Sequence, residues 1–311
     1  MEQLATSGAS THRIEQIGEQ LSTSLGWRDV QIAILPSLLT VTFDGRSDVM
    51  LTRTITCHLG RGFSVWRMEE IDSFLEMICD GRLPPSMIHA VSHRGQVKDR
   101  FYGNLLNWLA VALLNGGSGL LFFGIVWQGA AIASVIGLAV IGPLGMFAAR
   151  FPNFELVLAP ISAFCAGFMI RSAAVLNLLS RECIAGTHLS SIVTFAPGIP
   201  LTIASLELAS KSIVSGSSRL IASLFVAFSI GLGLNMGDEL AGLFDPNLVD
   251  TGSRCLEVSL WWWFLAYPLV FASLAVIMDA PPKRWPVMFA SASLAFFSLF
   301  GLSFFGAIRA C

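Results

Sequence analysis

The residues most capable of chemistry lie in an apolar stretch, Ala196-Pro197-Gly198-Ile199-Pro200. Each proline lacks a backbone N–H and clashes with the carbonyl four residues earlier, which costs about 3 kcal/mol inside a helix. Two prolines around a glycine therefore predict an unwound segment. Inside a membrane, such a segment offers free carbonyls to cations and helix ends to carboxylates. We expect Pro197, Gly198 and Pro200 to contact a substrate; the alternative is a passive kink.

Two asparagines and one arginine in other apolar stretches are further candidates. Asn115 begins the run Asn-Gly-Gly-Ser-Gly, which indicates either a flexible point or close helix packing, and Asn107 lies two turns before it. A charge inside a membrane costs roughly 2.5–3.5 kcal/mol, so Arg171 is the best candidate for a buried cation. We expect Asn115 and Arg171 to bind substrate, with Asn107 as a secondary candidate.

Glu207 and Lys211 lie four residues apart, a spacing that predicts an ion pair across one helical turn. Their place at the end of an apolar stretch favours an interfacial position, so both are secondary candidates for substrate binding. Glu155 and Arg219 are terminal in the same way, and we discount them.

Catalytic and metal-binding patterns are absent from the sequence. His89 and His93 have the i, i+4 spacing of metal ligands, but no neighbouring carboxylate or cysteine completes a set. There is no Gly-x-Ser-x-Gly elbow, phosphate loop or HExxH motif. The six scattered cysteines are interpreted as small buried apolar residues and not as a disulfide framework. We expect no enzyme activity, catalytic residue, metal or cofactor.

Composition indicates which elements must position these residues. Only 13% of the 311 residues are charged, against about 25% in soluble proteins. Of the 40 charged residues, 22 lie in Met1–Gly103. The net charge of −2 gives no reason to expect a nucleic acid partner. The sequence therefore predicts a soluble-type segment followed by a segment inside a lipid bilayer.

Seven stretches are long and apolar enough to cross a bilayer, which requires about 20 residues in a helix. Helices are expected because each backbone polar group needs an internal partner in lipid. The seven windows are Asn104–Trp127, Gly129–Ala149, Glu155–Leu178, His188–Leu208, Ser218–Asn235, Val258–Met278 and Trp285–Ile308.

The distribution of Lys and Arg between these windows predicts the orientation. With a cytosolic N-terminus, eight Lys and Arg residues lie in inner loops and three in outer loops, as the positive-inside rule requires. The first residues lack the pattern of a signal peptide. We expect a multi-pass membrane protein with its N-terminus in the cytosol. The sequence does not distinguish the plasma membrane from the vacuolar membrane.

The first 103 residues have the pattern of a small α+β domain. Ile14, Ile17 and Leu21 recur at helical spacing, and Met68–Asp80 predicts a second helix that ends before Gly81. Three strands are expected between these helices, at Val30–Leu35, Leu38–Phe43 and Val49–Cys57. The fold class is therefore mainly α, a polytopic helical membrane protein with a small α+β cytosolic domain. The expected domains are residues 1–103, a five-helix repeat over 104–237, an acidic outer loop over 238–257 and a partial repeat over 258–311.

Short motifs in two parts of the chain, near the N-terminus and around the fourth and fifth apolar stretches, resemble the threonine/serine exporter family. This family includes the fungal pheromone-regulated membrane protein branch. The similar stretches are Gly8–Glu15, Leu35–Ser37, Thr42–Asp44, Ala196–Gly198, Ser205–Lys211 and Ile213–Arg219. The resemblance implies a secondary transporter that exports threonine, serine or similar small amino acids and is driven by an ion gradient. The alternative is a non-transporting membrane protein whose cytosolic domain senses a ligand or docks a partner.

The resemblance also implies about ten helices in two inverted repeats of five. The similarity to the second repeat runs over Trp261–Phe305 and stops after two helices. We therefore expect either that further helices are encoded beyond Cys311, or that a second chain or a homodimer supplies them. Because one half of an inverted repeat lacks the opposing wall of the site, we expect that the chain alone does not transport.

Overall fold

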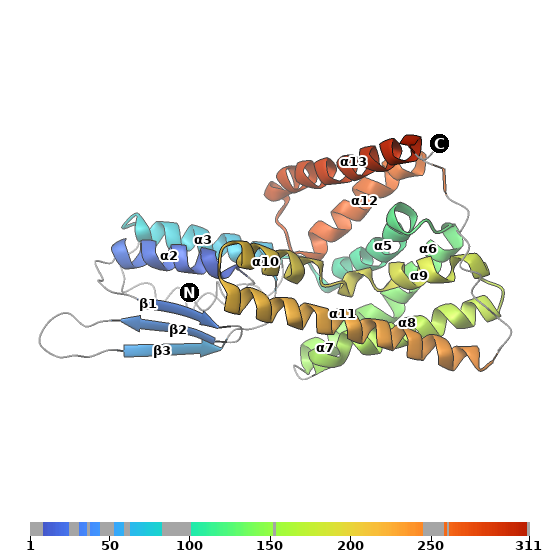
Figure 1. Ribbon diagram of the computed structural model, residues 1–311, viewed down its shortest axis with the longest axis horizontal. Helices are drawn as coiled ribbons and strands as arrows, with labels where there is room; N and C mark the ends of the chain where they lie inside the picture. Colours follow the sequence, from blue (N-terminus) through green and yellow to red (C-terminus); the bar gives the residue numbers. More distant parts are fainter. Residues whose placement is uncertain are drawn as a thin grey trace, which may run out of the picture. The chain divides into compact units, whose positions relative to one another are not determined.

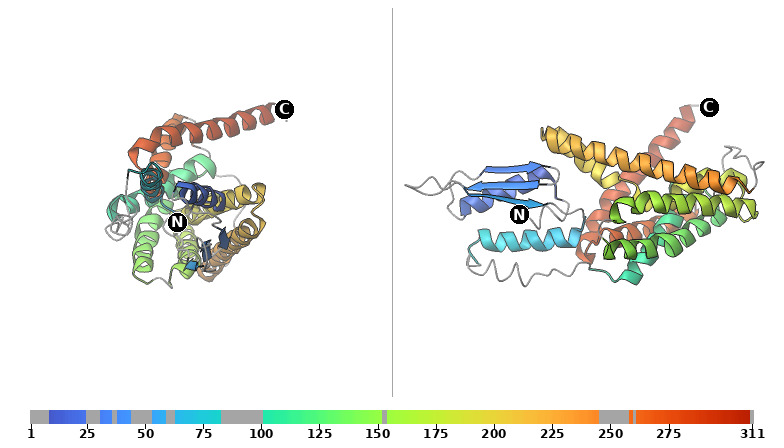
Figure 2. Two further views of the ribbon diagram at one scale, coloured as in Figure 1. Left: turned by 90° about the vertical axis from the view of Figure 1, so that its left-hand side faces the viewer. Right: turned by 90° about the horizontal axis from the view of Figure 1, so that it is seen from below.

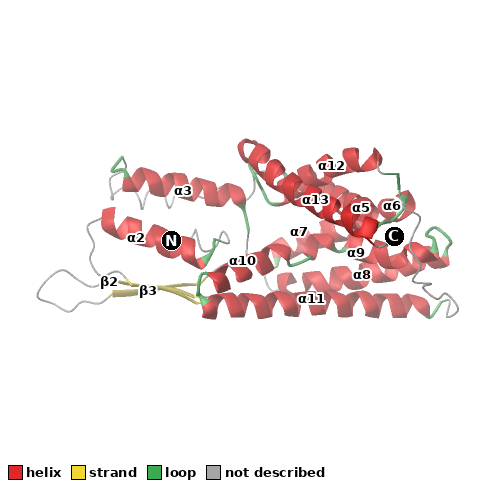
Figure 3. Ribbon diagram, turned by 45° about the horizontal axis from the view of Figure 1, so that its top comes forward, coloured by secondary structure: helices red, strands yellow, loops and turns green. Residues whose placement is uncertain are grey.

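The computed structural model describes residues 9–24, 31–35, 38–43, 53–58, 63–82, 101–151, 154–244, 258–259 and 261–309 (Figure 1). The chain forms two compact units, which are described separately. Unit 1 comprises Met1–Phe101, Ala159–Ala163 and Phe195–Gly233, and unit 2 comprises Tyr102–Leu158, Phe164–Thr194 and Leu234–Cys311. The described residues are mainly helical, and their strands all lie near the N-terminus (Figure 3).

Unit 1 begins with helices and strands close to those expected. They are α2 (Thr11–Ser24), β1 (Gln31–Leu35), β2 (Leu38–Phe43), β3 (Arg53–His58) and α3 (Val65–Cys79). The three strands form an antiparallel sheet in the order β1-β2-β3. Helix α2 packs against α3 and β1. Ile14, Ile71 and Ile78 are buried, as expected from their helical spacing.

Two further helices of unit 1 form a hairpin. Helix α10 (Gly198–Ala209) and the first part of α11 (Ile213–Gly242) run side by side in Figure 1 and in the right-hand view of Figure 2. Gly216 permits the close approach, because a Cβ there would lie 3.0 Å from the Leu208 nitrogen and 3.1 Å from the Ala204 oxygen.

Unit 2 is built around a buried helix, α5 (Asn104–Phe122), which packs against α6, α9 and α12. The remaining elements are α6 (Trp127–Ile136), the π-helix η1 (Gly137–Ile141), α7 (Gly142–Arg150), α8 (Glu155–Val175), η3 (Arg181–Cys183), α9 (Ile184–Ser191), η4 (Val193–Phe195), α12 (Trp261–Ile277), η5 (Pro282–Arg284) and α13 (Trp285–Arg309). Ile136, Ala166, Ile170 and Ile184 form one buried apolar cluster. All seven predicted windows coincide with helices or helix pairs.

The count of seven membrane spans is confirmed only in part. Within the described residues, four helices are long and apolar enough to cross a bilayer, and a fifth span results if α9 and α10 count as one. The apolar α12 has only 17 residues. A mainly helical membrane protein is therefore confirmed, whereas seven spans and a separate N-terminal α+β domain stay predictions.

Within the part of the chain that the structure describes, four helices end with the same backbone motif. After α3, α8, α10 and α12, a residue with positive φ reverses the chain: Gly81 (70°), Asn177 (56°), Lys211 (68°) and Asp279 (56°). At α10, the Ser212 N–H donates to the Glu207 carbonyl, and the Lys211 N–H donates to the Leu208 carbonyl, the pattern of a Schellman motif. Only Gly81 was expected from the sequence, because the other three residues are not glycine.

The interpretation of the cysteines was partly wrong. Cys183 is buried, but it forms a disulfide. Cys79 and Cys165 are free and half-buried. Scattered cysteines give no sequence signal of pairing, because the partners meet only when the chain folds.

Candidate functional site

The expected break in the fourth apolar stretch is present, although it lies earlier than predicted. Helix α9 ends at Ser191 and α10 begins at Gly198, with one short turn between them. Pro200 is the third residue of α10, and the Leu201 N–H already donates to the Pro197 carbonyl (3.1 Å). The first four N–H groups of a helix need no partner within it, so Pro200 fits the first turn without cost. The unwound segment predicted from Ala196 to Pro200 thus covers only the last part of the break.

Asn115 holds the first part of this break. Its side-chain nitrogen donates to the Ser191 carbonyl (2.8 Å), and its side-chain oxygen accepts from the Thr194 hydroxyl (2.7 Å). The Ser190 hydroxyl donates to the Asn115 carbonyl. Asn115 is fully buried. Since Ser191 is the last residue of α9, its carbonyl has no helical partner, and the Asn115 amide supplies one.

The glycines after Asn115 serve helix packing and not flexibility, because α5 continues through them without interruption. A Cβ on Gly116 would lie 2.7 Å from the Ala130 oxygen, and one on Gly119 would lie 2.6 Å from the Ser190 hydroxyl. The run therefore brings α6 and α9 close to Asn115. Of the two alternatives left by the sequence, close packing describes the structure.

A π-helix beside Asn115 was not expected from the sequence. It occupies Gly137–Ile141, and a Cβ on Gly137 would lie 3.1 Å from the Asn115 side-chain nitrogen. Single π turns inside membrane helices often occur at functional positions. The signal was Pro143, whose missing N–H and ring disturb the helix around residue 139.

The other candidates of unit 2 lie in different surroundings. Arg171 of α8 lies beside the last turn of α11, where a Cβ on Gly242 would be 3.9 Å from the guanidinium. The C-terminal end of a helix carries partial negative charge, which favours a cation there. Asn107 is half-buried in the first turn of α5, two turns before Asn115. The described contacts do not bring Arg171 together with Asn115.

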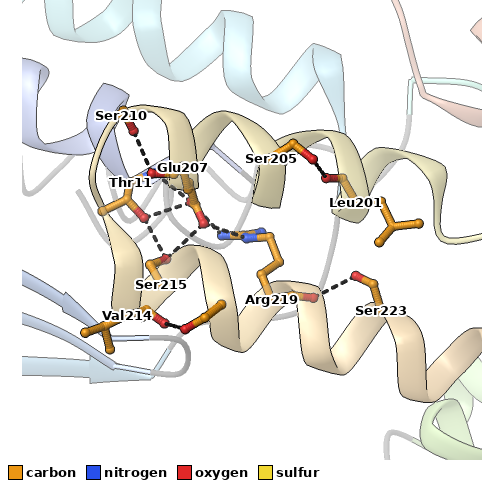
Figure 4. A network of polar contacts seen from close by, with 10 residues as sticks. Thr11, Leu201, Ser205, Glu207, Ser210, Val214, Ser215, Arg219 and Ser223 are labelled. Atoms are coloured by element: carbon orange, nitrogen blue, oxygen red, sulfur yellow. Dashed lines mark hydrogen bonds and ion pairs between the residues drawn. The ribbon is translucent and has the colours of Figure 1, made fainter.

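A second polar cluster, the Glu207 cluster, consists of Glu207, Thr11, Ser215 and Arg219 in unit 1 (Figure 4). The Glu207 side chain has no exposed surface. Its carboxylate accepts hydrogen bonds from the Ser215 hydroxyl (3.1 Å) and from two guanidinium nitrogens of Arg219 (3.2 and 3.3 Å). A buried carboxylate is stable only when a cation and further donors compensate for the lost water, and this cluster supplies both.

Thr11 provides the remaining donors from the N-terminal segment. It is the first residue of α2, so its N–H has no helical partner. This N–H donates to Glu207 Oε1 (3.1 Å), and the Thr11 hydroxyl donates to the same oxygen (2.8 Å). The hydroxyls of Thr11 and Ser215 also lie 2.9 Å apart. Residues 196 positions apart thus meet in one buried cluster.

The predicted pair of Glu207 and Lys211 is wrong. Lys211 occupies the left-handed position after α10 and is exposed, so its side chain leaves the helix face that carries Glu207. Arg219, which was discounted as terminal, is the actual partner of Glu207. Thr11 and Ser215 were also missed, although both lie in the motifs that resemble the exporter family.

A third polar cluster joins the ends of α5, α12 and α13 outside the apolar helices. The Tyr102 hydroxyl and the Trp285 indole N–H both donate to the Ala280 carbonyl (2.8 and 3.0 Å), and the Tyr102 N–H donates to Asp279 (3.3 Å). Burial raises the pKa of the Tyr102 phenol above its usual value of 10.0; the nearby Asp279 acts in the same direction, and the Trp285 hydrogen bond opposes both.

No metal site is apparent within the described ranges, where three or more His, Cys, Asp or Glu side chains do not gather at one point. His89 and His93 lie outside those ranges. The expectation that the chain has neither metal nor cofactor therefore stays a prediction.

Comparison with known proteins relates the chain to one family. Residues 2–240 match the model of the ThrE family, described as "Putative threonine/serine exporter". The chain is similar to pheromone-regulated membrane protein 10 of three yeasts: Kluyveromyces lactis (25% identity, 90% of this chain, 29% of that protein), Debaryomyces hansenii (26%, 94%, 29%) and Saccharomyces cerevisiae (25%, 90%, 36%). It therefore spans about a third of the length of these relatives. No solved structure matches the chain.

Proposed function

Because this chain belongs to the threonine/serine exporter family, we propose that it functions in the secondary transport of small amino acids with a hydroxyl group. The observation that carries this proposal is the break between α9 and α10, whose first part is held by the side chain of the buried Asn115. Transporters place their substrate sites at breaks of this kind, because freed backbone groups there can bind a charged ligand.

In the proposed mechanism, substrate binding exchanges partners at the break. The amide of Asn115 releases the Ser191 carbonyl, which then receives the substrate ammonium group. The N-terminal end of α10, where Pro197, Gly198 and Pro200 lie, carries partial positive charge that attracts the substrate carboxylate. In another conformation of the protein, the Arg171 guanidinium binds that carboxylate in place of the end of α10. An ion gradient drives the cycle.

The orientation of the chain is part of this proposal. The excess of Lys and Arg in the inner loops supports a cytosolic N-terminus. The disulfide of Cys183 supports the same orientation, because disulfides persist in oxidising compartments and Cys183 lies in a predicted outer loop. The description of the family as an exporter supports a direction of transport out of the cytosol.

A complete transport pathway requires a second half, by the logic of inverted repeats. We propose that further helices of a longer protein, a second chain or a second copy of this chain provide the opposing wall. Gradient-driven threonine or serine flux in liposomes that contain only this purified chain, as a monomer, would contradict that requirement.

Export from cells tests the function itself, because cells can supply a partner. Cells that express the chain and are loaded with a threonine-containing dipeptide should release threonine faster than cells with an empty vector. Asn115→Ala and Thr194→Val should reduce this release, because each removes a hydrogen bond at the break. Asn104→Ala, at an exposed asparagine of the same helix, is the matched control and should export normally. Equal release from expressing and empty cells would contradict the proposal.

A second candidate function is supported by the Glu207 cluster. It attaches the N-terminal segment, through Thr11, to the hairpin of α10 and α11. In this alternative, a ligand or partner of the N-terminal domain is sensed through the contact and nothing is transported. Normal membrane insertion without export, together with a ligand-dependent change in the protease sensitivity of α10, would favour it.

A further inference from the structure

We propose that Thr11 is a tethered ligand, and that the Glu207 cluster binds a free β-hydroxy amino acid when the N-terminal segment withdraws. The inference rests on the proposed function only for the class of substrate. The site differs from the break held by Asn115. The proposal is based on the observation that one threonine donates two hydrogen bonds to a single buried carboxylate oxygen.

The two donors of Thr11 have the geometry of a free amino acid. Its backbone nitrogen and its hydroxyl oxygen are joined through Cα and Cβ, and both contact Glu207 Oε1, at 3.1 and 2.8 Å. Free threonine and serine contain the same N–Cα–Cβ–O unit, with an ammonium in place of the amide. An ammonium forms a stronger, charge-assisted hydrogen bond with a carboxylate, so the free ligand can compete with the tethered one.

The remaining members of the cluster suit the rest of such a ligand. Arg219 holds Glu207 from the side opposite the N-terminal segment, and a third of its side chain is exposed (33%). This guanidinium holds the Glu207 carboxylate in position for the ammonium and hydroxyl groups of the ligand. The Ser215 hydroxyl oxygen lies 2.9 Å from the Thr11 hydroxyl oxygen, so it borders the position of the ligand hydroxyl. A site that binds a hydroxyl in this way discriminates against alanine and glycine, which lack one.

The consequence is a gate that responds to substrate. While Thr11 occupies the cluster, α2 is attached to the hairpin of α10 and α11. A free threonine or serine at sufficient concentration replaces Thr11 and detaches the start of α2. The alternative is that Thr11 only fastens the two segments, in which case the cluster never binds a free ligand.

Binding of radiolabelled L-threonine to the purified full chain in detergent tests the proposal. Thr11→Val removes the hydroxyl while keeping the size of the side chain, so the tethered ligand becomes weaker. The free ligand should then bind about tenfold more tightly, the equivalent of one hydrogen bond to a charged group. Thr11→Ser retains both donors and should bind like the parent chain. Glu207→Gln should abolish binding in every background.

Unchanged or weaker binding by Thr11→Val would overturn the proposal, and so would equal binding of L-alanine. If Thr11→Val does not fold, labelling of Ala9→Cys with a maleimide provides the second measurement, because Ala9 is 4% exposed. L-Threonine and L-serine should accelerate this labelling, whereas L-alanine should not; no acceleration would overturn the proposal. Failure of export with intact binding would contradict the proposed transport and leave this inference standing.

Discussion

Individual buried polar residues hold the parts of this molecule together. Glu207 receives hydrogen bonds from three residues of two distant segments, and Asn115 bonds the end of α9 and the short turn after it. A buried polar group that loses its partner costs more than the hydrogen bond itself was worth, because water cannot replace the partner. Changes at these residues should therefore have effects that surface substitutions do not.

The ion pair of Glu207 is the first case. Arg219→Ala leaves a buried carboxylate without its cation and should lower the free energy of unfolding by ~2–3 kcal/mol, below the usual cost of a fully buried pair because Arg219 is partly exposed. Thermal unfolding in detergent measures the loss. Lys211→Ala, at the exposed position once expected to pair with Glu207, should change stability by less than about 0.5 kcal/mol. Equal effects of the two substitutions would refute this description of the cluster.

Tyr102 gives the second case, through pH. Its raised pKa means that the unfolded chain loses the phenol proton first, near the usual value of 10.0, while the folded chain keeps it to higher pH. The unfolded state then binds fewer protons, so stability is intact below about pH 10 and falls as the pH rises through the folded pKa. Tyr102→Phe should remove this part of the alkaline loss and cost about 1 kcal/mol at neutral pH. Melting temperatures between pH 8 and 11 measure both effects. If the melting temperature falls equally with pH in the parent chain and in Tyr102→Phe, the role of Tyr102 is contradicted.

At the scale of elements, the helices of unit 2 are positioned by glycines at close approaches. Gly116, Gly119 and Gly129 each lie where a Cβ would overlap a neighbouring helix. Membrane helices associate through such small residues, because lipid offers no hydrophobic drive between apolar surfaces. The π turn at Gly137–Ile141 separates α6 from α7, and Schellman motifs end α8 and α12. These devices bring Asn115 to the end of α9.

Gly116→Ala tests this packing. The added methyl group has no room between α5 and α6, so we expect a loss of about 1–3 kcal/mol in stability. Gly231→Ala is the matched control, since a Cβ at that helical position meets nothing within 4 Å. The control should be neutral or stabilising by up to about 1 kcal/mol, because alanine favours a helix. The melting temperatures of both variants in one detergent decide the matter, and a harmless Gly116→Ala would show that the helices are not tightly packed here.

At the scale of the whole molecule, the arrangement in a membrane follows from the asymmetry of charge. We expect a cytosolic N-terminus with the segment after α11 outside, so a protease site inserted at Ser7 should be protected in intact cells and one at Pro246 should be cleaved. Permeabilised cells serve as the control and should show cleavage at both sites. Cleavage at Ser7 with protection at Pro246 in intact cells would contradict the proposed orientation.

The sequence by itself determined the elements with strong local signals. The helices of the N-terminal segment, the strands and the seven apolar stretches follow from the period and length of their apolar residues. The break before α10 follows from Pro197 and Gly198, because proline acts on its own helix. Gly81 likewise predicted the end of α3. Each of these features depends on residues within a few positions of one another.

Only the tertiary structure decided which polar groups meet. Glu207 has a plausible local partner in Lys211, four residues away, yet its donors come from Thr11, Ser215 and Arg219. The choice depends on how α10 ends and which segment packs against it, and local spacing carries no information on a contact 196 positions away. The glycines after Asn115 are the same case: their sequence permits flexibility or packing, and the neighbouring helices decide. A buried polar group takes the partner that the packing leaves beside it, because burial removes water as the alternative.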